Sequence, residues 1–160
     1  MKNIRELVIK TFVYILVFAM PNYATAENYY ADITKVSAIK SPLGSGYSLQ
    51  VTIKSSDKNC DHYVNWWEAV SENGELLYRR ILGHPHSREQ PFSRGGVTKS
   101  INDETVFYVR AHIHPFGYSN MGMKGSVKNG FSAVDITNGF AKHLANEGEI
   151  PSHCDASIDK

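Results

Sequence analysis

The stretch richest in chemically active side chains runs from residue 84 to residue 94 and reads HPHSREQPFSR. Its two histidines, His84 and His86, are separated by one residue, so an extended backbone directs both imidazoles to the same side. Imidazole pairs of this kind begin many Zn²⁺ and Cu²⁺ sites. Pro85 has no backbone N–H to donate, which places the segment at a strand end or in a loop. The stretch is therefore a candidate transition-metal site.

The position of Glu89 argues against one well-known form of such a site. In cupins, a His-x-His pair is followed after three or four residues by a glutamate ligand. Here only two residues separate His86 from Glu89, and three positions along a strand turn a side chain to the opposite face. The second histidine segment of the cupins also has no counterpart later in the chain. We therefore assign Glu89 and Gln90 as candidate binding residues of a different kind of site.

A second His-x-His pair, His112 and His114, ends the alternating segment TVFYVRAHIH at residues 105–114. Both histidines fall on the polar face of the expected strand, about 7 Å apart. We predict that they lie at the same end of the fold as His84 and His86, where the four imidazoles can hold zinc or copper. The simpler alternative is that they are solvent-facing histidines of an antiparallel sheet.

Two cysteines, Cys60 and Cys154, follow the N-terminal region. In an oxidising compartment the pair is expected to form a disulfide. Closing so long a loop stabilises a fold by about 4 kcal/mol in the chain-entropy model. In reduced form, the same cysteines with His62 and His153 would make a Cys2His2 zinc set, although their spacing is not that of a zinc finger. The disulfide is the prediction we adopt.

Arginine is confined to one part of the chain after residue 26, since all its arginines fall between residues 79 and 110: Arg79, Arg80, Arg88, Arg94 and Arg110. Arginine forms bidentate contacts with carboxylates and phosphates, and it also suits buried ion pairs. One interpretation is a surface that binds an anion or an acidic glycan, with candidate binding residues Arg80, Arg94, Arg110 and His62. The other is structural, and pairs the arginines with Glu68, Glu75, Glu89 and Asp61.

The N-terminus has the features of a signal peptide. Lys2, Arg5 and Lys10 are basic, residues 11–20 (TFVYILVFAM) are apolar and uncharged, and residues 24–26 (Ala-Thr-Ala) supply a small-x-small cleavage pattern. The apolar run is about half of the roughly 20 residues that a membrane-spanning helix needs. We therefore predict that residues 1–26 are removed and that the protein is periplasmic or secreted, with a retained N-terminal anchor as the alternative.

Residues 27–160 have the size of one ordinary domain. They hold fourteen basic and fifteen acidic residues, a net charge of −1. A nearly neutral chain lacks the electrostatic surface with which proteins bind nucleic acid or acidic membranes. We expect neither as a partner.

Short alternating segments separated by turns indicate an all-β fold. Residues 47–54 (YSLQVTIK) alternate like residues 105–114, and Asn73-Gly74 joins two strand-like runs as a hairpin turn would. The adjacent Trp66 and Trp67 place one ring in the core and one on the opposite face. The only helical pattern is short, near residues 139–145. These features predict a single antiparallel β-sandwich, immunoglobulin-like or related, with a short C-terminal helix.

The middle of the chain resembles an uncharacterised family of small exported bacterial proteins. The shared core reads approximately D-H-Y-x-x-x-W, then R-x-L-x-H-P-H-x-x-E-Q-P-F-x-R, then A-x-x-x-x-x-G-Y. The matching residues are Asp61, His62, Tyr63, Trp67, Arg80, Leu82, His84, Pro85, His86, Glu89, Gln90, Pro91, Phe92, Arg94, Ala111, Gly117 and Tyr118. The resemblance covers about residues 57–125 and implies export and a compact β fold. It implies no reaction, and it does not extend to residues 130–160.

No nucleophile in the chain is accompanied by a base in a recognisable catalytic motif. We therefore predict an exported, non-enzymatic binding or accessory module with a His/Arg/Glu-rich edge that takes a metal, an anion or a glycan. The alternative from another class is a small metalloenzyme that uses His84, His86 and either His112 or His114. A purely structural interaction protein is the third candidate.

Overall fold

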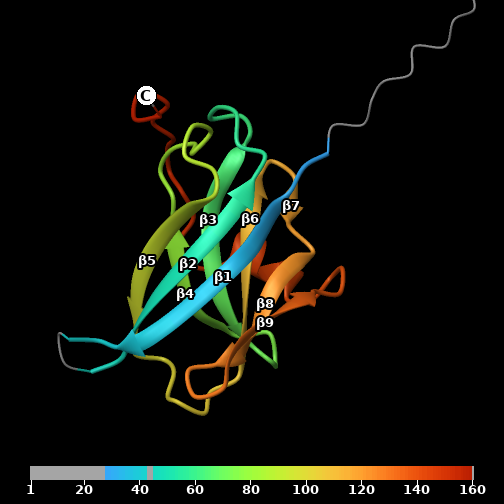
Figure 1. Ribbon diagram of the computed structural model, residues 1–160. Helices are drawn as coiled ribbons and strands as arrows, with labels where there is room; N and C mark the ends of the chain where they lie inside the picture. Colours follow the sequence, from blue (N-terminus) through green and yellow to red (C-terminus); the bar gives the residue numbers. More distant parts are fainter. Residues whose placement is uncertain (1–27, 43–44, 160) are drawn as a thin grey trace, which may run out of the picture.

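The computed structural model describes residues 28–42 and 45–159 of the chain, and nearly all of this part is antiparallel β structure. The elements are shown in Figure 1 and are β1 (Ala31–Lys40), β2 (Tyr47–Ser55), β3 (Tyr63–Ser71), β4 (Leu76–Ile81), β5 (Phe92–Thr98), β6 (Phe107–His114), β7 (Gly117–Tyr118), β8 (Met121–Ser126), β9 (Gly130–Asp135) and the 3-10 helix η1 (Lys142–Asn146). The predicted signal peptide, residues 1–26, lies outside the described residues.

The smaller sheet has the strand order β1-β2-β5. The alternation predicted at residues 47–54 is confirmed, because Leu49, Val51 and Ile53 of β2 are fully buried while their neighbours are less buried. β2 pairs with β1 on one side and with β5 on the other, both antiparallel. Its apolar face therefore lies at the centre of this sheet and points into the core.

The larger sheet has the order β4-β3-β6-β8-β9, and the short β7 pairs with β6. The predicted hairpin turn is confirmed between β3 and β4, where the Gly74 N–H donates to the Ser71 carbonyl at 3.0 Å. Gly74 has a φ of +86°, a conformation that a residue with a side chain rarely adopts. This turn sets the register that places Glu68 of β3 opposite Arg79 of β4.

The main core lies between the two sheets. It combines residues of β1, β2 and β5 with Val64, Trp67 and Ala69 of β3 and the apolar face of β6. β3 is buried on both faces, because its other face is covered by the chain that follows β9. We call residues 136–149 the arm. The outer face of the larger sheet is thereby buried as well, which places polar and charged side chains out of contact with water.

The expected C-terminal helix near residues 139–145 is replaced by the five-residue 3-10 helix η1, which begins at Lys142. Gly139 and Ala141 both have positive φ, 102° and 44°, and a right-handed helix cannot continue through such residues. The arm therefore crosses the sheet as an irregular segment with one tight turn. None of the helices in the described residues is long and apolar enough to span a membrane.

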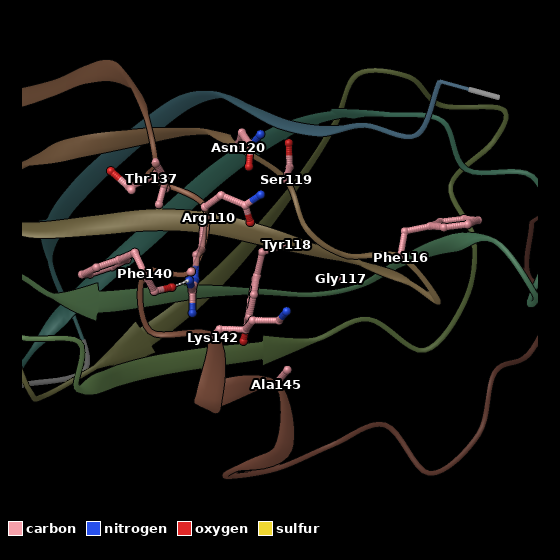
Figure 2. A pocket seen from close by; sticks show the side chains of 13 residues that line it. Arg110, Phe116, Gly117, Tyr118, Ser119, Asn120, Thr137, Phe140, Lys142 and Ala145 are labelled. Carbon is pink, nitrogen blue, oxygen red and sulfur yellow. Dashed lines mark hydrogen bonds between the residues drawn. The ribbon is translucent and has the colours of Figure 1, made fainter. Parts of the chain in front are cut away.

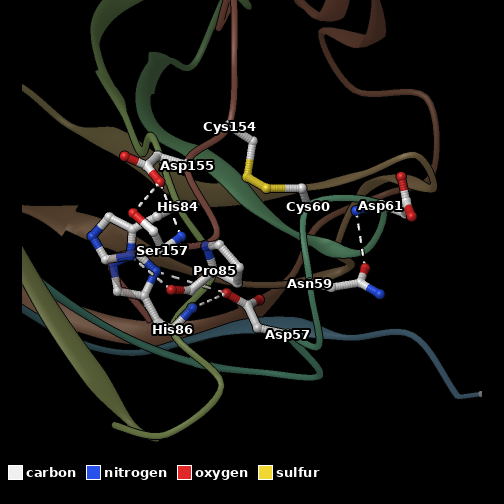
Figure 3. Close-up of a disulfide and its surroundings, with 10 residues drawn as sticks. All are labelled: Asp57, Asn59, Cys60, Asp61, His84, Pro85, His86, Cys154, Asp155 and Ser157. Atoms are coloured by element: carbon white, nitrogen blue, oxygen red, sulfur yellow. Dashed lines mark hydrogen bonds and ion pairs between the residues drawn. A yellow bond between two sulfur atoms is a disulfide. The ribbon is translucent and has the colours of Figure 1, made fainter. Parts of the chain in front are cut away.

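The predicted disulfide is present between Cys60 and Cys154, which are 94 residues apart in the chain (Figure 3). It ties the C-terminal tail to the segment that leads into β3. Beyond the bridge, the Asp155 N–H donates to the Gly83 carbonyl at 2.8 Å. The tail thus lies against the loop that contains the HPH sequence.

Candidate functional site

A buried ion cluster on the outer face of the larger sheet is centred on Glu68. The side chain of Glu68 is fully buried, and each of its oxygens is bound by a different arginine. Oε1 accepts from Arg110 Nε at 2.9 Å and Nη2 at 2.7 Å. Oε2 accepts from Arg79 Nε at 2.9 Å and Nη2 at 2.6 Å. The sheet register produces this arrangement, because β3 places Glu68 between Arg79 of β4 and Arg110 of β6.

The two arginines also hold the arm. Arg79 donates to the carbonyls of Leu144 (2.6 Å), Glu147 (2.6 Å) and Glu149 (3.1 Å). Arg110 donates to the carbonyls of Phe140 (2.5 Å) and Ala141 (2.8 Å). Backbone carbonyls are strong hydrogen-bond acceptors, so they are suitable partners for a buried guanidinium. Glu68 thus orients two arginines, and these fix the position of the arm.

Aromatic rings surround the cluster. The Trp66 ring stacks on His112 with centroids 3.9 Å apart, and Arg79 lies over Trp66 at 4.5 Å. Arg110 lies over the Tyr118 ring at 3.5 Å. Guanidinium groups above such rings gain a cation–π attraction that strengthens when water is excluded. The rings therefore help the larger sheet to accept charged groups on a buried face.

His112 is neutral in this setting. Its pKa is lowered to about 4, mainly by burial and to a smaller extent by the charges of Arg79, His114 and Arg110. With the Asn65 amide oxygen facing the ring, His112 Nδ1 is the donor in the 2.7 Å contact between them. Tyr118 is neutral too, since burial, followed by the charge of Glu68, raises its pKa to about 12.

A pocket of about 140 Å³ lies between the arm and the β7 region; we call it the arm pocket (Figure 2). Arg110 and Tyr118 contribute to its lining from the sheet, and Phe140 and Lys142 contribute from the arm. The rest of the lining includes neutral hydrogen-bonding side chains, namely Ser119, Asn120, Thr137 and Asn138. We call Glu68 with its two arginines, Arg79 and Arg110, the clamp. The clamp holds the arm in place, and the arm forms one wall of this small cavity.

The HPH loop is organised around a buried carboxylate, Asp57. Asp57 Oδ2 accepts from the His86 N–H at 2.9 Å, and Oδ1 accepts from the Val64 N–H at 2.9 Å and from Ser55 Oγ at 2.7 Å. His86 is buried, and its ring stacks on Phe92 with centroids 3.9 Å apart. Neither ring nitrogen of His86 has a hydrogen-bond partner within the described part of the chain. His86 Nδ1 is 3.7 Å from Asp57 Oδ2.

The polar residues that follow His86 contact neighbouring parts of the fold. Gln90 accepts from the Ser55 N–H at 2.8 Å, and its amide donates to Ser55 Oγ (2.8 Å) and to the His86 carbonyl (3.0 Å). Glu89 pairs with Arg94. These contacts agree with the structural interpretation of the arginines, in which Arg94 pairs with Glu89 and the loop packs against the fold.

His84 lies nearer the surface than His86. Its Nδ1 is 2.7 Å from the Pro85 carbonyl, and its ring is 4.3 Å from that of His86. A surface hollow of about 330 Å³ adjoins it, lined by His84, Arg88, Glu89, Arg94, Ile158 and Asp159. Ile158 and Asp159 of the C-terminal tail form part of this hollow; Figure 3 shows Asp155 and Ser157 of the same tail.

The two His-x-His pairs lie at the same end of the fold. His86 contacts Asp57, just ahead of β3, and the first residue of β3, Tyr63, is the register partner of His114. The pairs nevertheless have different surroundings, since His112 belongs to the Glu68 face and His114 borders a second hollow beside the disulfide. Among the residues that the structure describes, no group of three or more His, Cys, Asp or Glu side chains is arranged to hold a metal ion.

Two further candidate binding residues, His62 and Arg80, line neither the arm pocket nor the hollow beside His84. His62 Nε2 is 3.0 Å from Ser56 Oγ, and the His62 ring contacts Tyr29 and Phe116 edge-on. Arg80 is exposed on the edge strand β4. Of the residues assigned from the sequence as binding residues, Arg110 alone lines the arm pocket.

Sequence reasoning missed the arm pocket. Glu68 was named as an arginine partner and Tyr118 only as a residue of the shared core, and Phe140 and Lys142 were not singled out. A signal for the ion cluster was present in β3, where Glu68 lies inside the mostly apolar run HYVNWWEAV. On a strand that is buried on both faces, water does not solvate this carboxylate. It therefore requires cations on the neighbouring strands. The position of the arm had no comparable signal.

Comparison with known proteins identifies a relative from Halomicrobium mukohataei named "Putative lipoprotein". It is 30% identical to this chain over 121 residues, which are 76% of this chain and 59% of the relative. The chain thus spans less than two thirds of the relative's length. No protein-family model matches the chain, and no solved structure does.

Proposed function

We propose that this chain is an exported binding module that holds a small ligand in the arm pocket. The observation that carries the proposal is the clamp beneath the pocket. Glu68, Arg79 and Arg110 hold the arm through five carbonyl contacts, so one wall of the pocket is fixed before any ligand arrives. A preorganised site loses less conformational entropy on binding than a mobile one.

The lining favours binding over catalysis. The residues around the arm pocket supply cations, amides, hydroxyls and aromatic rings. Convergent polar groups beside rings are typical of ligand sites. Imidazole and carboxylate side chains are the commonest general acids and bases, and neither borders the pocket among the described residues. The pocket is smaller than the roughly 300 Å³ of sites for drug-sized molecules, so the ligand is small or enters with one end only.

Export rests on the N-terminal sequence and on the named relative. Residues 1–26 carry a basic start, an apolar run and a small-x-small pattern. The relative is named "Putative lipoprotein", and this name supports export of the present chain. The Cys60–Cys154 disulfide agrees with an oxidising compartment. We infer a periplasmic or secreted protein.

The strand order supports the immunoglobulin-like sandwich as the fold. In immunoglobulin constant domains the first, second and fifth strands share one sheet, and the third and sixth lie side by side in the other. The same holds here for β1-β2-β5 and for β3-β6. The fourth strand differs, since β4 pairs with β3. Such sandwiches place loops at the two ends of the domain, and the HPH loop lies at one of these.

Two-dimensional NMR tests the proposal with a defined panel of small molecules: D-glucose, D-glucuronate, benzyl alcohol and benzoate. We expect at least one of them to shift the signals of Arg110 Nε–H, Tyr118 and the backbone of residues 137–145. Shifts confined to the HPH loop, or no shifts with any panel member, would contradict the arm pocket as the binding site.

A further inference from the structure

The charge of the Glu68 cluster is not balanced. Two guanidinium groups share one carboxylate, and all three side chains are almost completely buried: Glu68 is 0%, Arg110 1% and Arg79 3% exposed. The cluster therefore holds a net charge of +1 away from water. The five arm carbonyls that the arginines contact are dipoles and lower the cost of this charge without cancelling it.

The carboxylates nearest the cluster on the arm, those of Glu147 and Glu149, belong to exposed residues, and the titratable side chains of the sheet beside the cluster do not compensate for the excess charge near neutral pH. Tyr118 would have to lose a proton to do so, and its raised pKa of about 12 keeps it neutral. His112 is also neutral, because burial and the nearby arginines lower its pKa to about 4. His114, the other imidazole near His112, is exposed at the end of β6. None of these groups can supply the missing negative charge.

The arm pocket is the cavity next to this buried charge. Arg110 lines it, and Arg110 Nη1 carries two N–H groups for which the described residues supply a single acceptor, the Phe140 carbonyl. Lys142 lines the pocket from the arm and is exposed. Among the ion pairs of the described residues, none involves Lys142. Among the residues that the structure describes, two cations therefore border the pocket, and no carboxylate does.

The remaining walls are suited to a flat or ring-shaped body. Phe116, Tyr118 and Phe140 contribute rings, and the four hydroxyl and amide side chains contribute neutral hydrogen-bonding groups. Rings of this kind stack on sugar or aryl faces. An inorganic anion would satisfy the cations but would leave these walls unused.

We propose that the arm pocket takes a carboxylate attached to a ring, with the carboxyl group bound by the two cations of the lining, Lys142 and Arg110, and the ring against Tyr118. This inference rests on the proposed binding function and specifies its ligand class. A sugar acid and an aryl acid share this chemistry, and the experiment separates them.

Isothermal titration compares each acid of the panel with its neutral partner: D-glucuronate with D-glucose, and benzoate with benzyl alcohol. A charge-assisted hydrogen bond is worth about 1.5–3 kcal/mol, so the acid should bind at least about tenfold more tightly than its neutral partner. The pair with the tighter acid identifies the ring as sugar or aryl. Added salt should weaken the acid and leave the neutral compound unchanged.

Lys142→Gln removes the exposed cation of the pocket, and Lys54→Gln removes an exposed cation of β2 as the matched control. Lys142→Gln should abolish most of the acid's advantage, and Lys54→Gln should keep it. The carboxylate inference is wrong if the neutral partners bind at the pocket as tightly as the acids. It is also wrong if the acid keeps the same affinity advantage in Lys142→Gln as in Lys54→Gln. In both cases the binding function stands. If no compound binds, both are wrong.

Discussion

Glu68 is a single carboxylate that neutralises one of two buried guanidiniums and orients both. Removing one partner of a buried ion cluster leaves uncompensated charge and costs about 3–5 kcal/mol. Glu68→Gln keeps the shape of the side chain, so we expect a loss of unfolding free energy of about this size, measured by urea denaturation.

Glu104→Gln provides the control for this change. Glu104 also pairs with a cation, Lys128, but both side chains are mostly exposed, at 67% and 59%. Exposed pairs contribute about 0–1 kcal/mol, so Glu104→Gln should cost little. Equal losses for the two variants would show that Glu68 does not hold a stability-determining cluster.

His112 makes the stability of the protein depend on pH. Its folded-state pKa of about 4 lies below the ordinary value of 6.5. Between these values the unfolded chain binds a proton that the folded protein does not, so stability is lost as the pH falls from about 6.5 towards 4. We expect His112→Gln to weaken this dependence by about 1–3 kcal/mol across that range. Urea denaturation of both proteins at several pH values measures the difference; parallel curves would contradict the assignment.

At the residue scale, the sequence predicted which residues pair with one another better than it predicted whether those residues are buried. The pairing of the arginines with Glu68 and Glu89 was one of its two interpretations, and both contacts are present. The alternation at residues 105–114 put Arg110 on the face away from the core. Whether that face was wet or covered could not be predicted, because the answer depends on a segment about thirty residues further along the chain.

The arm is the element that converts the ion cluster into a pocket. Arg79 alone contacts three of its carbonyls. We expect Arg79→Met to accelerate amide hydrogen exchange in residues 140–149, because these carbonyls and Glu68 lose their partner. Arg80→Met, at the next position of β4 but exposed, should leave exchange in the arm unchanged. Similar exchange in both variants would refute the clamp.

Among the elements, β2, β6 and the β3–β4 hairpin were predictable, because strict alternation and an Asn-Gly turn are local signals. The arm was not. Its residues resemble a short helix, but Gly139 and Ala141 adopt positive φ, and five carbonyls of the arm accept hydrogen bonds from arginines of distant strands. Tertiary contacts decide the conformation here, and a local pattern does not contain them.

At the scale of the molecule, one disulfide and a short tail close the end of the fold that carries both His-x-His pairs. The bridge spans 94 residues, and a loop of about 100 residues corresponds to about 4.7 kcal/mol in the chain-entropy model. We expect the double variant Cys60→Ser, Cys154→Ser to lose about 2–5 kcal/mol of stability.

The same double variant should expose the tail to limited proteolysis near residues 155–159, where the Asp155–Gly83 and Ser87–Asp159 contacts depend on the nearby bridge. The arm pocket lies on another part of the larger sheet, so ligand binding should survive. A tail that stays protected in the variant would show that its hydrogen bonds hold it without the bridge.

The measurement that tests the central claim most directly is ligand binding to a variant whose arm pocket is filled. Ala145 lines the pocket, and Ala145→Phe would occupy it; Ala133→Phe adds the same ring to an exposed position of β9. With the four-compound panel, we predict binding to the wild type and to Ala133→Phe, and none to Ala145→Phe, with both variants folded by circular dichroism. Binding that persists unchanged in Ala145→Phe, or that is absent from the wild type, would contradict the arm pocket as the functional site.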